Sequence, residues 1–129
     1  MSEKQKLIQI VSEIIFQINK ILILELDTQE KRNELNITVF SQKCPMCVEY
    51  MKDSICDKNC FLSNQKQHGC LNSKTKPKNK YNSDELKIRL LFWEKLLHLI
   101  SIKKDYLFEI KNRKKLQELI IKIDLQYGN

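Results

Sequence analysis

All five cysteines of this 129-residue chain lie between Cys44 and Cys70, and this clustering limits the fold more than any other feature of the sequence. Cys44-Pro-Met-Cys47 is a C-x2-C pair, and Cys56 and Cys60 form a wider C-x3-C pair. Thiolates at such spacings can bind one metal ion from a tight turn. An odd fifth cysteine fits a disulfide framework poorly, and we find no secretory signal before the cluster. The sequence therefore predicts a metal site.

The metal that these residues favour is one structural Zn²⁺, which takes four sulfur or nitrogen ligands in a tetrahedron. Four of the five cysteines are expected to bind, with Cys70 able to replace a member of the second pair and His68 as a weaker alternative. The sequence leaves that choice open. The candidate ligands are therefore Cys44, Cys47, Cys56, Cys60 and Cys70.

Zinc would have an energetic role, because residues 43–72 contain few apolar side chains to bury. Structural zinc contributes an apparent ~10–16 kcal/mol in small zinc-binding peptides. We therefore expect the metal to fold this segment and to hold it against the helices.

Two long stretches have the apolar periodicity of helices. Residues 83–103 are apolar on almost every side, and Asn82 with Glu85 three residues later is typical of a helix start. Such a helix is expected in the core or under a partner. His98 lies on its narrow polar row, where no acid or nucleophile is spaced for catalysis. In residues 3–26, the stripe consists of Leu7, Val11, Ile14, Ile18 and Ile21.

The remaining segments give shorter signals. The polar stretch "DTQEKRNEL" predicts a loop or a frayed turn, and the alternation of side chains at 35–40 predicts a short strand. The polar segment after Cys70 contains Pro77 and predicts an exposed loop. Apolar spacing near the end of the chain favours a helix at 112–124, although the residues from 121 to 127 also alternate as in a strand.

These signals predict a single domain, 1–129, of the α+β class and mostly α. Amphipathic helices are expected to pack around a short strand and a zinc-stabilised loop segment. The expected parts are an N-terminal helix and strand at 1–42, a zinc-binding insert at 43–82 and a C-terminal helical part at 83–129.

The net charge of +7 is concentrated on the cysteine segment and on the lysine-rich stretch after it. A basic patch of this kind can attract a phosphate backbone, although a solvated linker or charge compensation of bound thiolates would explain it too. Few aromatic residues are available there for base stacking. The candidate nucleic-acid contacts are Lys74, Lys76, Lys78 and Lys80.

The cysteine segment resembles a group of small, uncharacterised phage and prophage proteins. The shared features are C-P-x-C, "EYMKD", a close second cysteine pair, "GC", a Tyr after a polar gap and an apolar helix with Phe-Trp, over about residues 44–100. The group has a C-x2-C second pair, whereas this chain has C-x3-C. The resemblance implies a metal-stabilised module from a mobile element, and it implies no activity.

We expect the protein not to be an enzyme, because the sequence has no glycine-rich phosphate loop, no H-E-x-x-H and no recognisable triad order. The favoured function is a zinc-stabilised protein-interaction module that binds and inhibits a host factor, such as an RNA-guided (CRISPR) defence effector. The alternative is a zinc-containing protein that binds nucleic acid through the basic 43–80 segment.

The expected partner is accordingly a host protein or a nucleoprotein complex. A homodimer through 3–26 or 83–103 is a further expectation. No stretch is apolar enough to be a membrane span, and the expected location is the cytoplasm, that of the host cell if the protein is phage-encoded.

Overall fold

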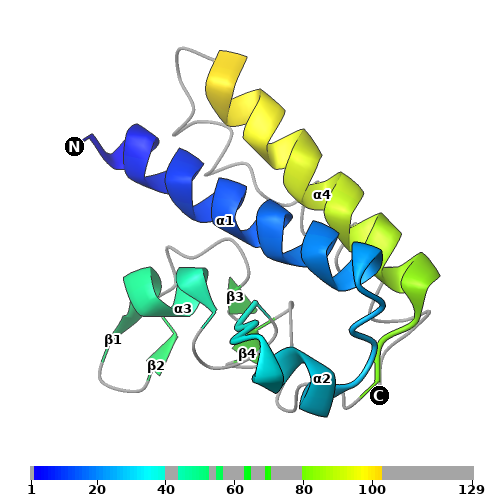
Figure 1. Ribbon diagram of the computed structural model, residues 1–129. Coiled ribbons are helices and arrows are strands. Elements are labelled where there is room, and N and C mark those ends of the chain that lie inside the picture. Colours follow the sequence, from blue (N-terminus) through cyan, green and yellow to red (C-terminus); the bar gives the residue numbers. More distant parts are fainter. Residues whose placement is uncertain are drawn as a thin grey trace.

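The computed structural model describes residues 2–39, 44–52, 55–56, 63–64, 69–70 and 80–102. Within these residues the chain is mostly helical, with little strand. The long helices α1 (Glu3–Ile23) and α4 (Ser83–Ile102) run antiparallel and pack against each other (Figure 1). The short helix α3 (Pro45–Tyr50) also contacts α1, and α2 (Gln29–Glu34) follows α1 directly in the chain.

The predicted helix at 3–26 is confirmed as α1. It begins with a capping box, in which the Ser2 hydroxyl accepts from the Gln5 backbone N–H and the Gln5 side chain bonds back to Ser2. It ends in a turn whose Glu25 has a positive φ of 53° and whose Leu26 N–H donates to the Ile21 carbonyl over 3.0 Å. The whole predicted apolar stripe is buried, namely Leu7, Val11, Ile14, Ile18 and Ile21.

Where the sequence predicted a loop, the chain forms the short helix α2. Thr28 is its N-cap, because the Thr28 hydroxyl accepts from the Lys31 backbone N–H over 3.3 Å. This bond satisfies one of the donors that every helix start leaves without a helical partner. A polar six-residue helix gives almost no periodic signal, which explains why the pattern did not predict it.

The strand predicted at 35–40 is wrong for residues 35–39, and residue 40 lies outside the described residues. Leu35 instead caps α2, and Asn36 has a positive φ of 56°. The Ile37 N–H donates to the Arg32 carbonyl over 3.0 Å, as the second residue after a helix cap does in a Schellman turn. The Thr38 N–H then donates to Oε1 of Gln17 on α1, over 3.1 Å. This segment is therefore a helix-ending turn laid against α1.

The predicted helix at 83–103 is confirmed as α4, and Asn82 caps it through an Oδ1 that accepts from the Asp84 N–H over 2.7 Å. Its start is tied to the end of α1, because the Tyr81 N–H donates to the Asp27 carbonyl over 2.9 Å. The pair Phe92 and Trp93 lies in the core, with ring centroids 5.1 Å apart in an edge-to-face arrangement.

Two small hairpins complete the described part. Strand β1 (Met51–Lys52) pairs antiparallel with β2 (Ile55–Cys56), and β3 (Ser63–Asn64) pairs antiparallel with β4 (Gly69–Cys70). The helix predicted at 112–124 lies outside the described residues. Among the helices that the structure describes, none has both the length and the apolar character needed to cross a bilayer.

Candidate metal centre

The first cysteine pair lies at the start of α3. Cys44 is 3% exposed, and its carbonyl accepts from the Val48 N–H over 3.0 Å, so Cys44 holds the N-cap position. Pro45 then occupies the first helical position, where its missing N–H costs nothing. Cys47 is at the third position. The N-cap and third residues are three apart, so their backbones lie in one helical turn, which is the spacing of C-x2-C pairs that bind one ion.

The backbone of Cys56 lies opposite Met51, the residue that follows α3. The β1–β2 hairpin therefore returns the backbone of Cys56, the first member of the second pair, to the end of the helix that starts with the first pair. Cys70 lies opposite Ser63 in the other hairpin. Cys60 and the alternative ligand His68 are outside the described residues, so the choice of four ligands stays open. In the described ranges, no three or more Cys, His, Asp or Glu side chains are clustered as metal ligands.

Helix α3 is fixed on the N-terminal half of α1. Nζ of Lys6 lies 2.8 Å from Oε1 of Glu49, and Met46 is fully buried in the core. Burial of a Met side chain contributes roughly 1.5–3 kcal/mol, whereas an exposed ion pair contributes about 0–1 kcal/mol. Apolar packing is therefore what holds the Cys44–Cys47 turn in place.

The sequence did not predict a buried polar cluster at the other end of α1. We call it the Tyr81 centre, and it consists of Arg32, Tyr81, Glu85 and Arg89, all buried. The guanidinium carbons of Arg32 and Arg89 lie 4.9 Å and 5.7 Å from the centre of the Tyr81 ring. Nε of Arg89 also lies 3.4 Å from Oε2 of Glu85. The cluster thereby joins α2 to the first turns of α4.

The Arg32 side chain is also held by the turn before α2 and by α2 itself. Its Nη1 donates to the Leu26 carbonyl and its Nη2 to Oε1 of Gln29, each over 3.2 Å. Burial lowers the pKa of Arg32, and the neighbouring Tyr81 and Asp27 act in the opposite direction. Arginine nevertheless stays protonated in proteins. These contacts therefore stabilise a buried positive charge.

One signal for the Tyr81 centre was present in the sequence. Glu85 and Arg89 stand four residues apart, on the same side of α4 as the apolar Phe92. A charged pair on the apolar side of a helix indicates a buried ion pair. No such signal marks Arg32, because it lies in a uniformly polar stretch.

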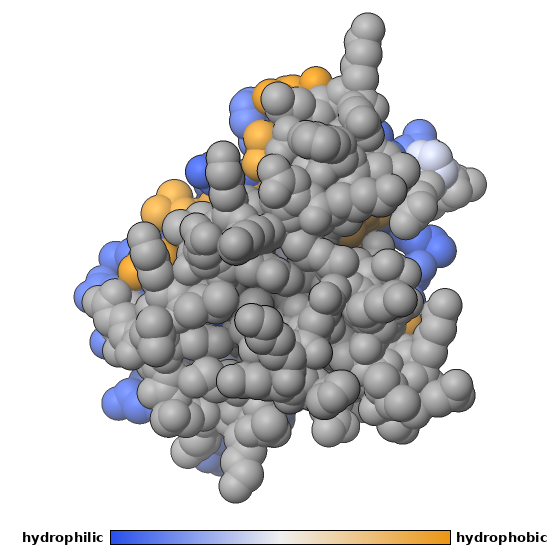
Figure 2. Space-filling view, turned by 180° about the vertical axis from the view of Figure 1, so that it is seen from behind, coloured by the Kyte–Doolittle hydropathy of each residue, from blue (hydrophilic) through white to orange (hydrophobic). Residues whose placement is uncertain are grey.

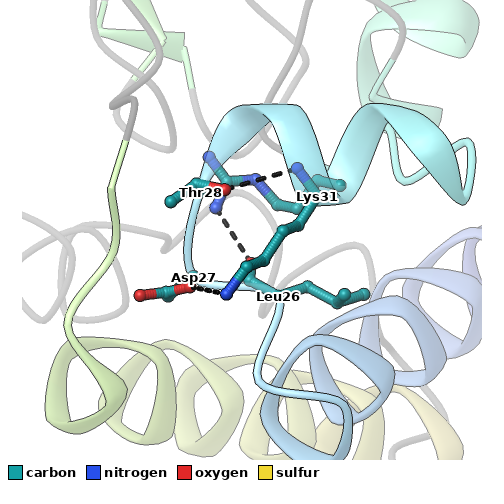
Figure 3. A network of polar contacts seen from close by, with 5 residues as sticks. Leu26, Asp27, Thr28 and Lys31 are labelled. Atoms are coloured by element: carbon teal, nitrogen blue, oxygen red, sulfur yellow. Dashed lines mark hydrogen bonds and ion pairs between the residues drawn. The ribbon is translucent and has the colours of Figure 1, made fainter.

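Charged groups also surround the turn between α1 and α2 (Figure 3). Nζ of Lys31 lies 3.0 Å from Oδ1 of Asp27, and this hydrogen bond is the main reason that the pKa of Asp27 is lowered. The charge of Lys80 lowers the same pKa to a smaller extent. Asp27, Lys31 and Lys80 line an open cleft of about 600 Å³ together with the start of α4.

The predicted nucleic-acid residues are only partly described. Lys80 is exposed, and it stands beside the Asp27 carboxylate, which offsets part of its charge. Lys74, Lys76 and Lys78 lie outside the described residues. His98 is exposed on α4, as the sequence predicted.

No protein-family model matches the sequence, and neither a curated protein nor a solved structure matches it.

Proposed function

We propose that this protein is a non-enzymatic, zinc-stabilised interaction module that binds and inhibits a host protein. A defence effector guided by RNA is an example of such a host protein. The observation that supports the proposal is an exposed apolar row on an otherwise firmly packed helix. Phe16 and Ile23 of α1 are 61% and 77% exposed.

These two residues stand seven positions apart, so they lie on one side of α1, with Lys20 between them. The opposite side of α1 carries the buried stripe, which keeps the helix in one orientation. A rigid aromatic side chain on an ordered helix loses little entropy on binding, and such residues dominate the energetics of many interfaces. The row is therefore suited to a protein partner.

The zinc would be held by Cys44 and Cys47 together with two of the other three cysteines. The position of the first pair at the N-cap and third residue of α3 supports this assignment. In this proposal the ion is structural: it closes residues 43–72 and holds them beside α1.

The proposal is tested by recovering the partner from native host cells with the tagged, zinc-loaded chain and then reconstituting the complex from purified components. Phe16→Ala should weaken binding about tenfold or more, as expected for an aromatic anchor. Leu91→Ala on α4 serves as a matched control, since it also shortens an exposed apolar side chain, and it should leave affinity unchanged.

The complex should also reduce the activity of the partner in a purified assay. Unchanged affinity of a folded Phe16→Ala variant would contradict the proposed surface. A complex with nucleic acid that weakens steeply with salt, and that is lost when Lys74, Lys76, Lys78 and Lys80 are neutralised, would contradict the proposal and support the alternative function.

A further inference from the structure

The outward side of α4 carries apolar side chains that are exposed in the described part of the chain. Leu91 is 64% exposed and Ile88 is 36% exposed, although α4 is otherwise part of the core. Figure 2 shows apolar and polar surface alternating along the edge of the molecule where α4 lies.

The two residues belong to a row with a definite charge order. From the start of α4 the row is Asp84, Ile88, Leu91 and Lys95, at spacings of four, three and four, which lie on one side of a helix. All of these residues are exposed. Acidic Asp84 stands at one end, basic Lys95 at the other and the apolar pair between them. We call these four residues the α4 row.

We propose that two copies of this protein pair through their α4 rows, with the helices antiparallel about a two-fold axis between Ile88 and Leu91. In this register Ile88 of each copy packs on Leu91 of the other. Asp84 of each copy faces Lys95 of the other. A second copy of the chain is therefore the partner that fits the α4 row. When the second row runs in the opposite direction, each charge meets its opposite and the apolar residues meet each other.

A second pair of charges supports the same register. Lys87 and Glu94 lie beside the α4 row, seven residues apart on its polar flank, and both are exposed. In the antiparallel pair, Lys87 of each copy faces Glu94 of the other, as flanking residues do in antiparallel coiled coils. One register therefore brings together the apolar side chains and both kinds of opposite charge.

The other arrangements are less favourable. Parallel helices in register would place Lys95 against Lys95 and Asp84 against Asp84, and like charges in such positions repel. An antiparallel pair shifted by one heptad would place Leu91 against Lys95 and Glu94 against Glu94. Charge therefore selects both the direction and the register.

The paired surface is small, because only one helix face from each copy takes part. A stable interface buries roughly 800 Å² on each partner, and this row is too short for that area. We therefore expect a reversible dimer with a Kd of roughly micromolar to millimolar. The row is on α4, whereas the proposed host contact is on α1, so this inference does not rest on the proposed function.

Sedimentation equilibrium of the full, zinc-loaded and reduced chain at low ionic strength tests the proposal. The average mass should rise from one chain toward two as concentration increases. Lys87→Glu should raise the Kd about five- to thirtyfold, because two attractive contacts become repulsive. Glu94→Lys should do the same, and the double variant Lys87→Glu with Glu94→Lys should restore dimerisation.

Leu91→Gln should also abolish the dimer, whereas Phe16→Gln on α1 should not. Circular dichroism of each variant shows whether α4 is retained. A wild-type chain that remains monomeric at millimolar concentration would overturn the proposal. A dimer that is lost with Phe16→Gln, or that the double charge reversal fails to restore, would overturn it as well.

Discussion

At the residue scale, two non-glycine residues carry the turns that end α1 and α2. Glu25 and Asn36 have φ values of 53° and 56°, in the left-handed region that glycine adopts without cost. Asn tolerates this conformation better than other side chains, whereas a Glu there is disfavoured by about 1–2 kcal/mol. The chain accepts this cost because the next residue, Leu26 or Ile37, is buried in the core.

Replacing Glu25 with Gly should therefore stabilise the protein. We expect the free energy of unfolding to rise by up to about 1 kcal/mol, because the strain is relieved while Gly adds entropy to the unfolded chain. Urea unfolding at neutral pH measures it. Gln9→Gly, on the exposed side of α1, is the matched control and should lower stability by about 1 kcal/mol. A loss of stability in Glu25→Gly comparable to that control would contradict the interpretation.

Arg32 should contribute far more to stability than the adjacent Lys31. Its guanidinium is buried over Tyr81 and bonded to the Leu26 carbonyl, whereas the Lys31 ion pair with Asp27 is largely exposed. We expect Arg32→Ala to cost about 2–4 kcal/mol and Lys31→Ala less than about 1 kcal/mol. Equal losses for the two variants in urea unfolding would show that the Tyr81 centre has no structural role.

At the element scale, the buried side of α4 contains a donor for which the described residues supply no hydrogen-bond partner. Among the buried side-chain polar atoms of the described residues, Nε1 of Trp93 is the one without a hydrogen-bond partner. A buried unsatisfied donor costs about 1–3 kcal/mol. The ring is nevertheless fully buried and packs edge-to-face on Phe92, so its apolar area offsets that cost.

Trp93→Phe should consequently change stability little. It removes the unsatisfied N–H but loses buried area, so we expect a net change within about 1 kcal/mol. Ile14→Ala, a truncation of a buried α1 residue, should cost about 2–5 kcal/mol in the same thermal and urea experiments. A loss for Trp93→Phe as large as that for Ile14→Ala would mean that the indole N–H is satisfied.

The elements also show which sequence signals are reliable. Helices α1 and α4 were predicted because long apolar periodicity reflects burial directly. The alternation at 35–40 was misread, since Ile37 and Val39 are buried by the turn after α2 while Leu35 is exposed. Two buried residues that stand two positions apart in a turn are enough to produce the same alternation as a strand. Tertiary contacts such as the Thr38–Gln17 bond are invisible in the sequence and decide the outcome.

Part of the candidate metal centre could also be predicted from the sequence. Cys44 and Cys47 were expected in a tight turn, and the turn proves to be the start of α3, because Pro45 suits the first position of a helix as well as a turn. In the Tyr81 centre only the Glu85–Arg89 pair leaves a signal in the sequence, since Arg32 and Tyr81 are far apart in the chain and meet only in the fold.

At the scale of the whole molecule, the candidate metal centre and the Tyr81 centre lie at opposite ends of α1. Helix α3 with Cys44 is held near the N-terminus of α1 mainly by the buried Met46, and the Tyr81 centre lies near the other end, where Arg32 donates to the Leu26 carbonyl. The proposed partner surface on α1 and the proposed self-pairing surface on α4 are both carried by this frame. Unfolding of the helices should therefore abolish binding at both surfaces. A substitution at Phe16 or at Leu91 should affect only the surface that contains that residue.

The central claim is that zinc stabilises the protein, and metal content measured together with thermal unfolding tests it most directly. We predict one zinc ion per chain after purification under reducing conditions. A strong chelator should remove the ion and lower the unfolding temperature by more than about 10 °C, with recovery when zinc is returned. Cys44→Ser should lose the metal and reproduce the chelated state. A metal-free chain whose unfolding temperature is unaffected by chelator would contradict the claim.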